Sequence, residues 1–354
     1  MSPAYSRKCL LFLSVLAFYT FGSCSLAQSQ VPTAVDHASY VLFDAPNALS
    51  TTVVGNNNGG EVVGYFKDAS SGVTRGFVRE PKGEITVFDA SKTALETMPA
   101  AINESGDVAG FFFDPTTGIH SFLRNAQGNI TVFEVPQLCG NAPPTGFAMA
   151  IDNRDDIAGY IIPCPLADLW VGFVRDHQGE ITTFAPITNG SVPTGINQRG
   201  DITGVTSPYF PAQEGFVRDA KGVMTVFAAG GEGPGPKAHP VGINNRGSIT
   251  GFFFDSRSGT TRGFLRDAKG KITIIDAAGA TGETQPAGIN DSDEIVGAGG
   301  GHNFLRDSKG NLTFFDVPNT SGAQAVAINN RGDVAGYFLG AAGGTRGFVR
   351  IAHP

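Results

Sequence analysis

The stretch Gly172-Phe173-Val174-Arg175-Asp176 decides the fold, because the chain contains a version of it seven times. The repeated phenylalanines are spaced 45, 51, 43, 48, 40 and 44 residues apart. They are Phe77, Phe122, Phe173, Phe216, Phe264, Phe304 and Phe348. An arginine follows each two residues later, at Arg79, Arg124, Arg175, Arg218, Arg266, Arg306 and Arg350. A period of about 45 residues indicates a repeat architecture.

Two further patterns recur with the same period. The pattern Asn-x-x-Gly-Asp-(Ile/Val)-x-Gly begins at Asn57, Asn103, Asp152, Asn197, Asn244, Asn290 and Asn329. The pattern Thr-x-Phe-Asp-x-Pro surrounds Phe43, Phe88, Phe133, Phe184, Phe227, Ile275 and Phe315. Each unit therefore holds four strand-sized apolar runs separated by turn residues.

The links between the runs show where a unit begins. The first and second runs are joined by the Asn-x-x-Gly turn, in which Gly106 and its equivalents supply a positive φ. Asp155 and Asp293 take that place in two units, and Asp tolerates the left-handed region. The link from the fourth run to the next unit varies most, up to the 13 residues from Ala228 to Pro240. Tight turns belong inside a unit, so the first run is innermost.

The two ends of the chain complete each other. Tyr40 to Pro46 is a fourth run without a unit, and the last unit stops at its third run at Arg350. We therefore predict an all-β, seven-bladed β-propeller of four-stranded blades, the last closed by the N-terminal strand. A solenoid would explain the period but not the extra strand. The propeller forms one domain over residues 38–354, after a short leader over 28–37.

The innermost position carries a prediction of its own. The residue before each first-run Ile position is small, at Gly55, Ala101, Ala150, Gly195, Gly242, Gly288 and Ala327. Seven strands converging on an axis would crowd that point. We also predict a register in which the acidic residue after the turn pairs with the arginine, so that Gly64 faces Gly76.

The first 27 residues have the pattern of an export signal. Arg7 and Lys8 precede the apolar run from Cys9 to Phe21, and Ser25-Leu26-Ala27 offers a cleavage site near Ala27. The apolar run is short for a membrane span. Lipidation at Cys24 remains an alternative, although Phe21 and Gly22 fit that motif poorly. We expect a secreted, extracellular or periplasmic protein with no membrane span.

Composition argues against polyanionic partners. Removal of Arg7 and Lys8 with the signal leaves 23 basic against 32 acidic residues, a net charge of −9. Nucleic-acid binding requires clustered Lys and Arg. We therefore expect no nucleic-acid partner, and we expect the protein to be a monomer.

The repeat resembles the bacterial extracellular HAF repeat family. The residues that carry the resemblance are the Gly-Ile-Asn-x-x-Gly-Asp-Ile-x-Gly element, His120-Ser121-Phe122 and His302-Asn303-Phe304. The resemblance covers about residues 38 to 350. The chain departs from it in having Arg-Gly-Phe in most units and in lacking a Trp after the Phe. The resemblance implies a bacterial exported repeat protein, and the family has no established general function.

Two repeated charge patterns have a structural interpretation. Arg199-Gly200-Asp201 and Arg331-Gly332-Asp333 match an integrin-binding tripeptide, but both lie in the recurring turn. The acidic column could suggest calcium binding, and its members are Glu61, Asp107, Asp156, Asp201, Glu294 and Asp333, with Ser248 as the exception. No Asp-x-Asp-x-Asp-Gly loop accompanies it. We expect instead a cross-strand salt bridge to the arginine column in each blade.

No catalytic or metal signature is present in the sequence. The histidines form no i, i+4 pair and no His-Glu-x-x-His motif, and they are His37, His120, His177, His239, His302 and His353. No Gly-x-Ser-x-Gly elbow occurs. We predict no catalytic residues, no metal and no cofactor, and favour a protein that is not an enzyme.

Cys139 and Cys164 are the two cysteines outside the signal segment. Cys139 lies in the loop entering the third blade, and Cys164 in the long link between that blade's second and third runs. Strand directions put both loops on one face, and an exported protein meets oxidising conditions. We therefore predict a structural Cys139–Cys164 disulfide.

The same face holds all the variable loops and is where we expect function. The candidate ligand-binding residues are Trp170, Tyr209, Phe210, Lys237 and His239. Exposed aromatic residues around an axial depression suit sugar stacking or a peptide, although Trp170 and Phe210 could instead cap blade cores. We favour a non-catalytic module that binds an extracellular glycan or protein. The alternatives are a secreted enzyme acting on polysaccharide, as a lyase or hydrolase, and a structural matrix component.

Overall fold

The computed structural model describes residues 38–138, 145–163, 170–185, 190–206, 213–230, 236–277, 279, 282–341 and 343–352. These residues belong to the compact unit Ala34–Pro354. Their regular secondary structure consists of 28 β-strands. The predicted all-β class is therefore confirmed.

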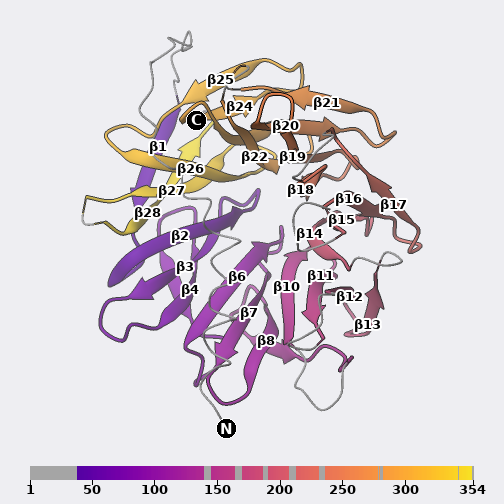
Figure 1. The fold of residues 1–354 in the computed structure, drawn as a ribbon. Coiled ribbons are helices and arrows are strands. Elements are labelled where there is room, and N and C mark those ends of the chain that lie inside the picture. The colour runs from indigo at the N-terminus through magenta and orange to yellow at the C-terminus, as the bar shows by residue number, and fades with distance from the viewer. Residues whose placement is uncertain are drawn as a thin grey trace. The chain divides into compact units, whose positions relative to one another are not determined.

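The strands form seven successive groups of four around a common centre (Figure 1). The first four groups are β2 (Ala48–Asn56), β3 (Val62–Asp68), β4 (Thr74–Arg79), β5 (Ile85–Phe88); β6 (Glu96–Ile102), β7 (Val108–Asp114), β8 (Gly118–Arg124), β9 (Ile130–Phe133); β10 (Thr145–Ile151), β11 (Ile157–Ile162), β12 (Val171–Arg175), β13 (Ile181–Phe184); β14 (Val192–Ile196), β15 (Ile202–Val205), β16 (Gly215–Arg218), β17 (Met224–Phe227). The last three are β18 (His239–Ile243), β19 (Ile249–Asp255), β20 (Thr260–Arg266), β21 (Ile272–Ile275); β22 (Thr284–Ile289), β23 (Ile295–Gly299), β24 (His302–Arg306), β25 (Leu312–Phe315); β26 (Ser321–Ile328), β27 (Val334–Leu339), β28 (Thr345–Ile351) and β1 (Ser39–Phe43). We number these groups as blades 1 to 7.

Five blades are separate four-stranded antiparallel sheets. Blades 1 and 2 share the sixth sheet, because Thr74 of β4 pairs in parallel with Glu96 of β6. The first strand of each blade contacts the first strand of the next, and β26 contacts β2. This closed circuit places the first strands innermost, as the sequence predicts.

The N-terminal strand closes the ring. β1 pairs antiparallel with β28 from Ser39↔Ile351 to Phe43↔Gly347. The ion pair between Arg346 Nη2 and Asp44 Oδ2, at 2.7 Å, extends the contact beyond the strand end. The extra strand therefore fills the vacant fourth position, as predicted.

Small residues let the inner strands approach each other. A Cβ on Gly195 would lie 3.3 Å from the backbone nitrogen of Ile243 in the next blade. A Cβ on Gly288 would lie 3.3 Å from the Cα of Ala327. These contacts explain why Gly195 and Gly288 are small, and at Gly55 and Gly242 an added Cβ would be in ordinary contact, 3.6 Å from the nearest side chain.

The predicted register is wrong by one residue. Val62, rather than Glu61, pairs with Arg79, so that Gly64 faces Phe77 and Tyr65 faces Gly76. The reason is that Glu61 closes the turn: its N–H donates to Asn57 Oδ1 at 3.0 Å, and its carbonyl accepts from Asn57 N at 3.1 Å. The ladder to the third strand therefore starts one residue later.

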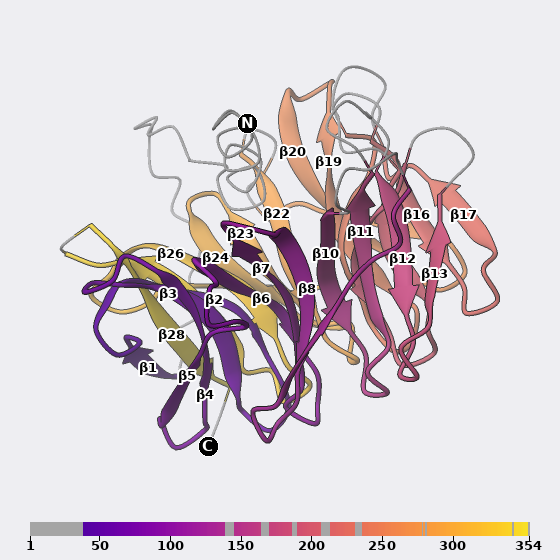
Figure 2. The same cartoon turned by 90° about the horizontal axis from the view of Figure 1, so that it is seen from below.

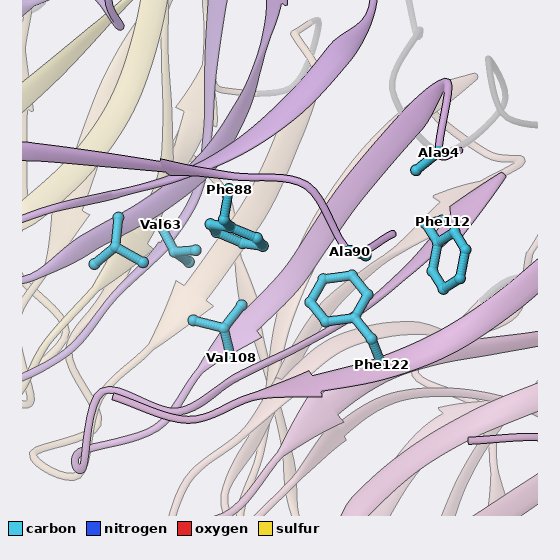
Figure 3. Packing of buried hydrophobic residues seen from close by; sticks show 8 residues of the cluster. Val63, Phe88, Ala90, Ala94, Val108, Phe112 and Phe122 are labelled. Atoms are coloured by element: carbon cyan, nitrogen blue, oxygen red, sulfur yellow. The ribbon is translucent and has the colours of Figure 1, made fainter. Parts of the chain in front are cut away.

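The core lies between adjacent blades. Figure 3 shows the cluster between blades 1 and 2, where Phe88 of β5 meets Phe122 of β8. Their ring centroids are 6.0 Å apart and the planes are inclined at 75°. The same edge-on pair recurs as Phe43–Phe77, Phe133–Phe173, Phe184–Phe216 and Phe227–Phe264.

Each blade directs its strand ends to two faces (Figure 2). We call the turn face the side that carries the links from first to second and from third to fourth strands, such as residues 57–61 and 80–84. The loop face carries the other links, such as residues 69–73 and 89–95. The two faces differ in how many of their polar groups form hydrogen bonds with one another.

Candidate functional site

The turn face is occupied by its own hydrogen bonds. The Asn57 amide donates to the carbonyl of Asn103 in the next blade at 3.0 Å. Five equivalent bonds follow the ring: Asn103 to Asp152, Asn197 to Asn244, Asn244 to Asn290, Asn290 to Asn329 and Asn329 to Asn57, all between 2.8 and 3.1 Å. The seventh position holds Asp152, whose carboxylate cannot donate to Asn197.

A second ring uses the next residue of each turn. The backbone N–H of Asn58 donates to Glu104 Oε2 at 2.9 Å. The series continues through Glu104, Asn153, Gln198, Asn245, Asp291 and Asn330, and returns to Asn58 Oδ1 at 2.7 Å. This face therefore joins the blades to one another.

The arginine column does not form the predicted salt bridges. Arg124 Cζ lies 5.0 Å from the ring centroid of Phe88 in the preceding blade. Five other column members make the same contact: Arg79 with Phe43, Arg175 with Phe133, Arg218 with Phe184, Arg266 with Phe227 and Arg350 with Phe315. Because the register differs by one residue, the acidic residue does not lie opposite the arginine. The arginine side chain instead contacts a phenylalanine ring of the preceding blade.

The acidic column pairs within the turn instead. Asp201 lies 2.6 Å from Arg199, and Asp333 lies 2.8 Å from Arg331. In both Arg-Gly-Asp sequences the two charged groups therefore bind each other across the turn glycine. This contact supports the structural interpretation of the tripeptides and opposes adhesion through them.

Toward the loop face, the innermost strands have a position whose residue type differs between blades, unlike the repeated residues of the turn face. In every blade, the second strand has a glycine at the same position of the repeat. The residue after this glycine pairs with one residue of the innermost strand, so the seven innermost-strand residues are equivalent in register. The pairs, which we call the variable column, are Thr52–Tyr65, Met98–Phe111, Phe147–Tyr160, Val192–Val205, His239–Phe252, Gln285–Ala298 and Gln324–Tyr337. The second-strand residue before each pair is glycine in all seven units, whereas the inner-strand members of the column differ from blade to blade.

Two of the three tyrosines of the column, Tyr65 and Tyr337, lie at partly exposed positions. The Tyr337 hydroxyl donates to Gln324 Oε1 at 2.7 Å. Burial raises the pKa of Tyr337, and the neighbouring Tyr65 raises it further. Burial also raises the pKa of Tyr65, opposed by a hydrogen bond with Thr52. Both phenols therefore stay uncharged at neutral pH.

His239 is the predicted ligand-binding residue that belongs to the column. Its ring stacks on Phe252 at 4.6 Å between centroids, inclined at 15°. Nδ1 lies 3.1 Å from Oε1 of the buried Gln213. Burial lowers the pKa of His239 to about 4. The imidazole is therefore neutral, with its proton on Nδ1, and no described residue hydrogen-bonds to Nε2.

Trp170 caps a blade core. It stacks on Tyr160 at 4.9 Å with an inclination of 5°. Tyr160 stacks on Phe147 at 4.8 Å, and Phe147 meets Phe111 edge-on at 5.0 Å. The geometry supports the capping interpretation that the sequence left open for this residue.

The other candidate residues are only partly described. Lys237 Nζ lies 3.7 Å from Glu214 Oε1, beside the loop-face end of β18. Tyr209 and Phe210 lie outside the described residues, as do Cys139 and Cys164, so the disulfide stays a prediction. Sequence reasoning missed Tyr65, Gln285, Gln324 and Tyr337. Their signal was the position next to a glycine that all seven units share, or the cross-strand partner of that position.

Acidic residues bind three other histidines. His120 contacts Glu134 at 2.6 Å, His177 contacts Asp156 at 3.3 Å and His302 contacts Asp316 at 2.8 Å. His37 and His353 lie outside the described residues. Within the described ranges, no group of three or more His, Cys, Asp or Glu side chains is arranged to hold a metal ion.

Two hollows lie away from the column. One, of about 240 Å³, opens on the turn face between blades 3 and 4 and is lined by Arg154, Asp156 and Arg218. The other, of about 580 Å³, lies at the outer strands of blades 1 and 2, beside Arg75 and Asp89. Arg154, Asp156 and Arg75 already form ion pairs there, and Arg218 stacks on Phe184. We therefore place the candidate site at the column rather than in these hollows.

The part of the chain that the structure describes contains no helix long and apolar enough to span a membrane.

Comparison with known proteins shows the fold. No family model and no curated protein matches the chain. A streptogramin B lyase structure has a TM-score of 0.56 at 15% identity, covering 89% of this chain and 98% of that one. A catalytically inactive virginiamycin B lyase from Staphylococcus aureus with quinupristin has a TM-score of 0.58 at 14% identity, covering 89% and 100%. Puromycin hydrolase has a TM-score of 0.57 at 13% identity, covering 86% of this chain and 53% of that one. The structural similarity shows a β-propeller fold, and at this low sequence identity it shows no particular activity.

Proposed function

We propose that the protein is an exported, non-catalytic binding module with seven blades, which holds an extracellular glycan or protein at the variable column on its loop face. The observation that carries the proposal is the contrast between the two faces. Turn-face residues repeat and bind one another in one closed ring and in an amide ring that lacks only the bond at Asp152. Column residues differ from blade to blade, and most are partly exposed.

The chemistry of the column favours binding over catalysis. A general acid or base works best when its pKa lies near the working pH. The pKa of His239, at about 4, is too low for an acid at neutral pH and makes a weak base. Its Nε2 is instead suited to accept a hydrogen bond from a ligand.

A binding screen tests the proposal. Residues 28–354 are incubated with a broad panel of soluble and insoluble polysaccharides, and every bound sample is examined for cleavage products. The Gln285→Ala/Gln324→Ala variant is compared with Lys309→Ala, a change in an exposed turn of blade 6. We expect retention without cleavage, lost in the column variant and kept in the control. Cleavage would contradict the proposal and favour a polysaccharide lyase or hydrolase.

Absence of retention has a separate meaning. It would direct the search to protein ligands, with capture by the wild type and not by the column variant as the expected result. A protein that binds neither class would support a structural role in the matrix and overturn the proposal.

A further inference from the structure

The variable column contains no charged residue type. Its fourteen positions hold Thr, Tyr, Met, Phe, Val, His, Gln and Ala, and no Asp, Glu, Lys or Arg. The one titratable group near neutrality, His239, is uncharged because burial holds its pKa at about 4. An anionic ligand would need cationic partners, and a cationic ligand would need carboxylates.

Charged groups lie two residues further out from the column along its strands. Glu96, Glu283 and Lys237 occupy these positions on the inner strands of blades 2, 6 and 5, and Lys67 occupies the equivalent position on the second strand of blade 1. Lys237 is paired with Glu214, and Glu283 Oε2 accepts a hydrogen bond from Gln285 at 3.4 Å. Burial raises the pKa of Glu96, which favours its neutral form. Among the described residues at these positions, both signs of charge occur.

The column is open in one sector and closed in another. Phe147, Tyr160, Val192 and Val205 in blades 3 and 4 are buried, and Trp170 covers Tyr160. The pairs in blades 5, 6, 7, 1 and 2 are partly exposed. Blade 2 supplies the apolar Met98 and Phe111, whereas the polar members of the column other than Tyr160 lie in blades 5, 6, 7 and 1, which we call the open sector.

The polar groups of the open sector include both donors and acceptors. Gln324 accepts from Tyr337 through Oε1, which leaves its Nε2 hydrogens as donors. His239 offers Nε2 as an acceptor. Sugar hydroxyls both donate and accept, so they can satisfy such a mixture, and the nearby aromatic rings present apolar surface to sugar C–H groups.

We infer that the ligand is an uncharged, hydroxyl-rich molecule of the neutral oligosaccharide class, bound at the open sector formed by blades 5, 6, 7 and 1. This inference rests on the proposed function and names its ligand. Hydrogen bonds to neutral hydroxyls make the affinity nearly independent of salt, whereas binding of a charged glycan weakens with ionic strength.

The test is calorimetric titration of residues 28–354 with neutral glucan, mannan and xylan oligosaccharides and with uronate oligosaccharides, at low and high salt. Gln324→Leu removes the free donors, and Lys309→Ala changes an exposed turn of blade 6 outside the column. Far-ultraviolet circular dichroism and thermal unfolding confirm that both variants fold. We expect binding of a neutral oligosaccharide that is insensitive to salt, at least about tenfold weaker in Gln324→Leu and unchanged in Lys309→Ala.

The remaining outcomes separate the two proposals. A uronate ligand whose affinity falls with salt and with Gln324→Leu would overturn this inference and keep the proposed function. Glycan binding that neither Gln324→Leu nor the Gln285→Ala/Gln324→Ala variant changes would overturn both. Failure of every oligosaccharide to bind would overturn the ligand class alone.

Discussion

The guanidinium of Arg124 lies over the ring of Phe88, 5.0 Å from its centroid, and so joins the third strand of blade 2 to the fourth strand of blade 1. Arg124 Nη1 also donates to the carbonyl of Asn125 at 3.2 Å. Burial lowers the pKa of Arg124, but a guanidinium stays charged in proteins. The contact recurs at six of the seven blade boundaries, and the seventh has Ile275 in place of the phenylalanine.

This exception provides a control for the energy of the contact. A double-mutant cycle on Arg124→Leu and Phe88→Leu, measured by urea unfolding, should give a coupling of about 0.5 to 2 kcal/mol, because a partly desolvated cation–π pair is lost. The same cycle on Arg306→Leu and Ile275→Leu should give a coupling near zero. Equal couplings at the two boundaries would show that packing, rather than the ring face, stabilises the pair.

Removal of the closing strand should destabilise the propeller. A chain that begins at Ala48 lacks β1, the Phe43 ring beneath Arg79 and the Asp44 partner of Arg346. It also leaves β28 as an unpaired edge. We expect Tm to fall on the order of 10 °C or more relative to a chain that begins at Ala38, which keeps β1. Equal Tm values for the two chains would contradict closure by this strand.

The incomplete amide ring predicts two opposite changes in stability. Asn197→Asp should lower the free energy of unfolding by about 0.5 to 1.5 kcal/mol, because the Asn244 carbonyl loses the Asn197 amide donor and keeps only the Gly247 N–H. The variant reproduces the Asp-x-Arg-x-Asp sequence of blade 3, where Arg154 binds both Asp152 and Asp156. Asp152→Asn should stabilise by roughly 0.5 to 1.5 kcal/mol through the missing seventh bond. Thermal unfolding of both variants tests this, and a shift of the same sign in both would refute it.

His239 should make stability depend on pH. Its pKa is about 4 in the folded protein and about 6.5 in an unfolded chain. Between these values the unfolded state binds more protons, so the free energy of unfolding falls as the pH drops from 6.5 to 4. The contribution is up to about 3 kcal/mol and is fully present above pH 6.5.

The matched variant for this effect is His239→Gln. The free energy of unfolding of this variant should change less with pH between pH 4 and 6.5 than that of the wild type. Above pH 7, the free energies of unfolding of the two proteins should change with pH in parallel. Parallel profiles over the whole range would mean that His239 is not held neutral by the fold.

The predicted Cys139–Cys164 disulfide is open to a direct measurement. Titration of residues 28–354, unfolded without reductant, should find no free thiol. Two reactive thiols would disprove the bridge. Cys139→Ser, which leaves one free thiol at Cys164, is the control that shows the titration to be complete.

Much of the architecture was accessible from the sequence because a repeat compares the chain with itself. The seven phenylalanines, the turn glycines and the fourth run at Tyr40 to Pro46 predicted the strand count, the innermost strand and the ring closure. The left-handed positions were also predictable, and Asp155 and Asp293 have φ values of 67° and 61°. Each of these features depends on local backbone chemistry that every unit repeats.

The register and the partner of the arginine column required the tertiary structure. Residues equivalent to Glu61 and Arg79 recur in the repeat, with Ser248 as the one exception in the acidic column, but Asn57 binds both backbone groups of Glu61 and the ladder starts one residue later. Phe88 then supplies the surface that Arg124 covers, from another blade.

The candidate site shows the same division. His239 was a candidate from its loop position alone, but its neutral state depends on Phe252 and Gln213, which approach it only in the fold. Tyr65 and Tyr337 are far apart in the chain, and Tyr65 raises the pKa of Tyr337 only because the first and last blades are adjacent. By itself the sequence determined what every blade shares, because strand and turn preferences act over a few residues. The tertiary structure decided which side chains meet between blades, because those contacts depend on how the ring closes.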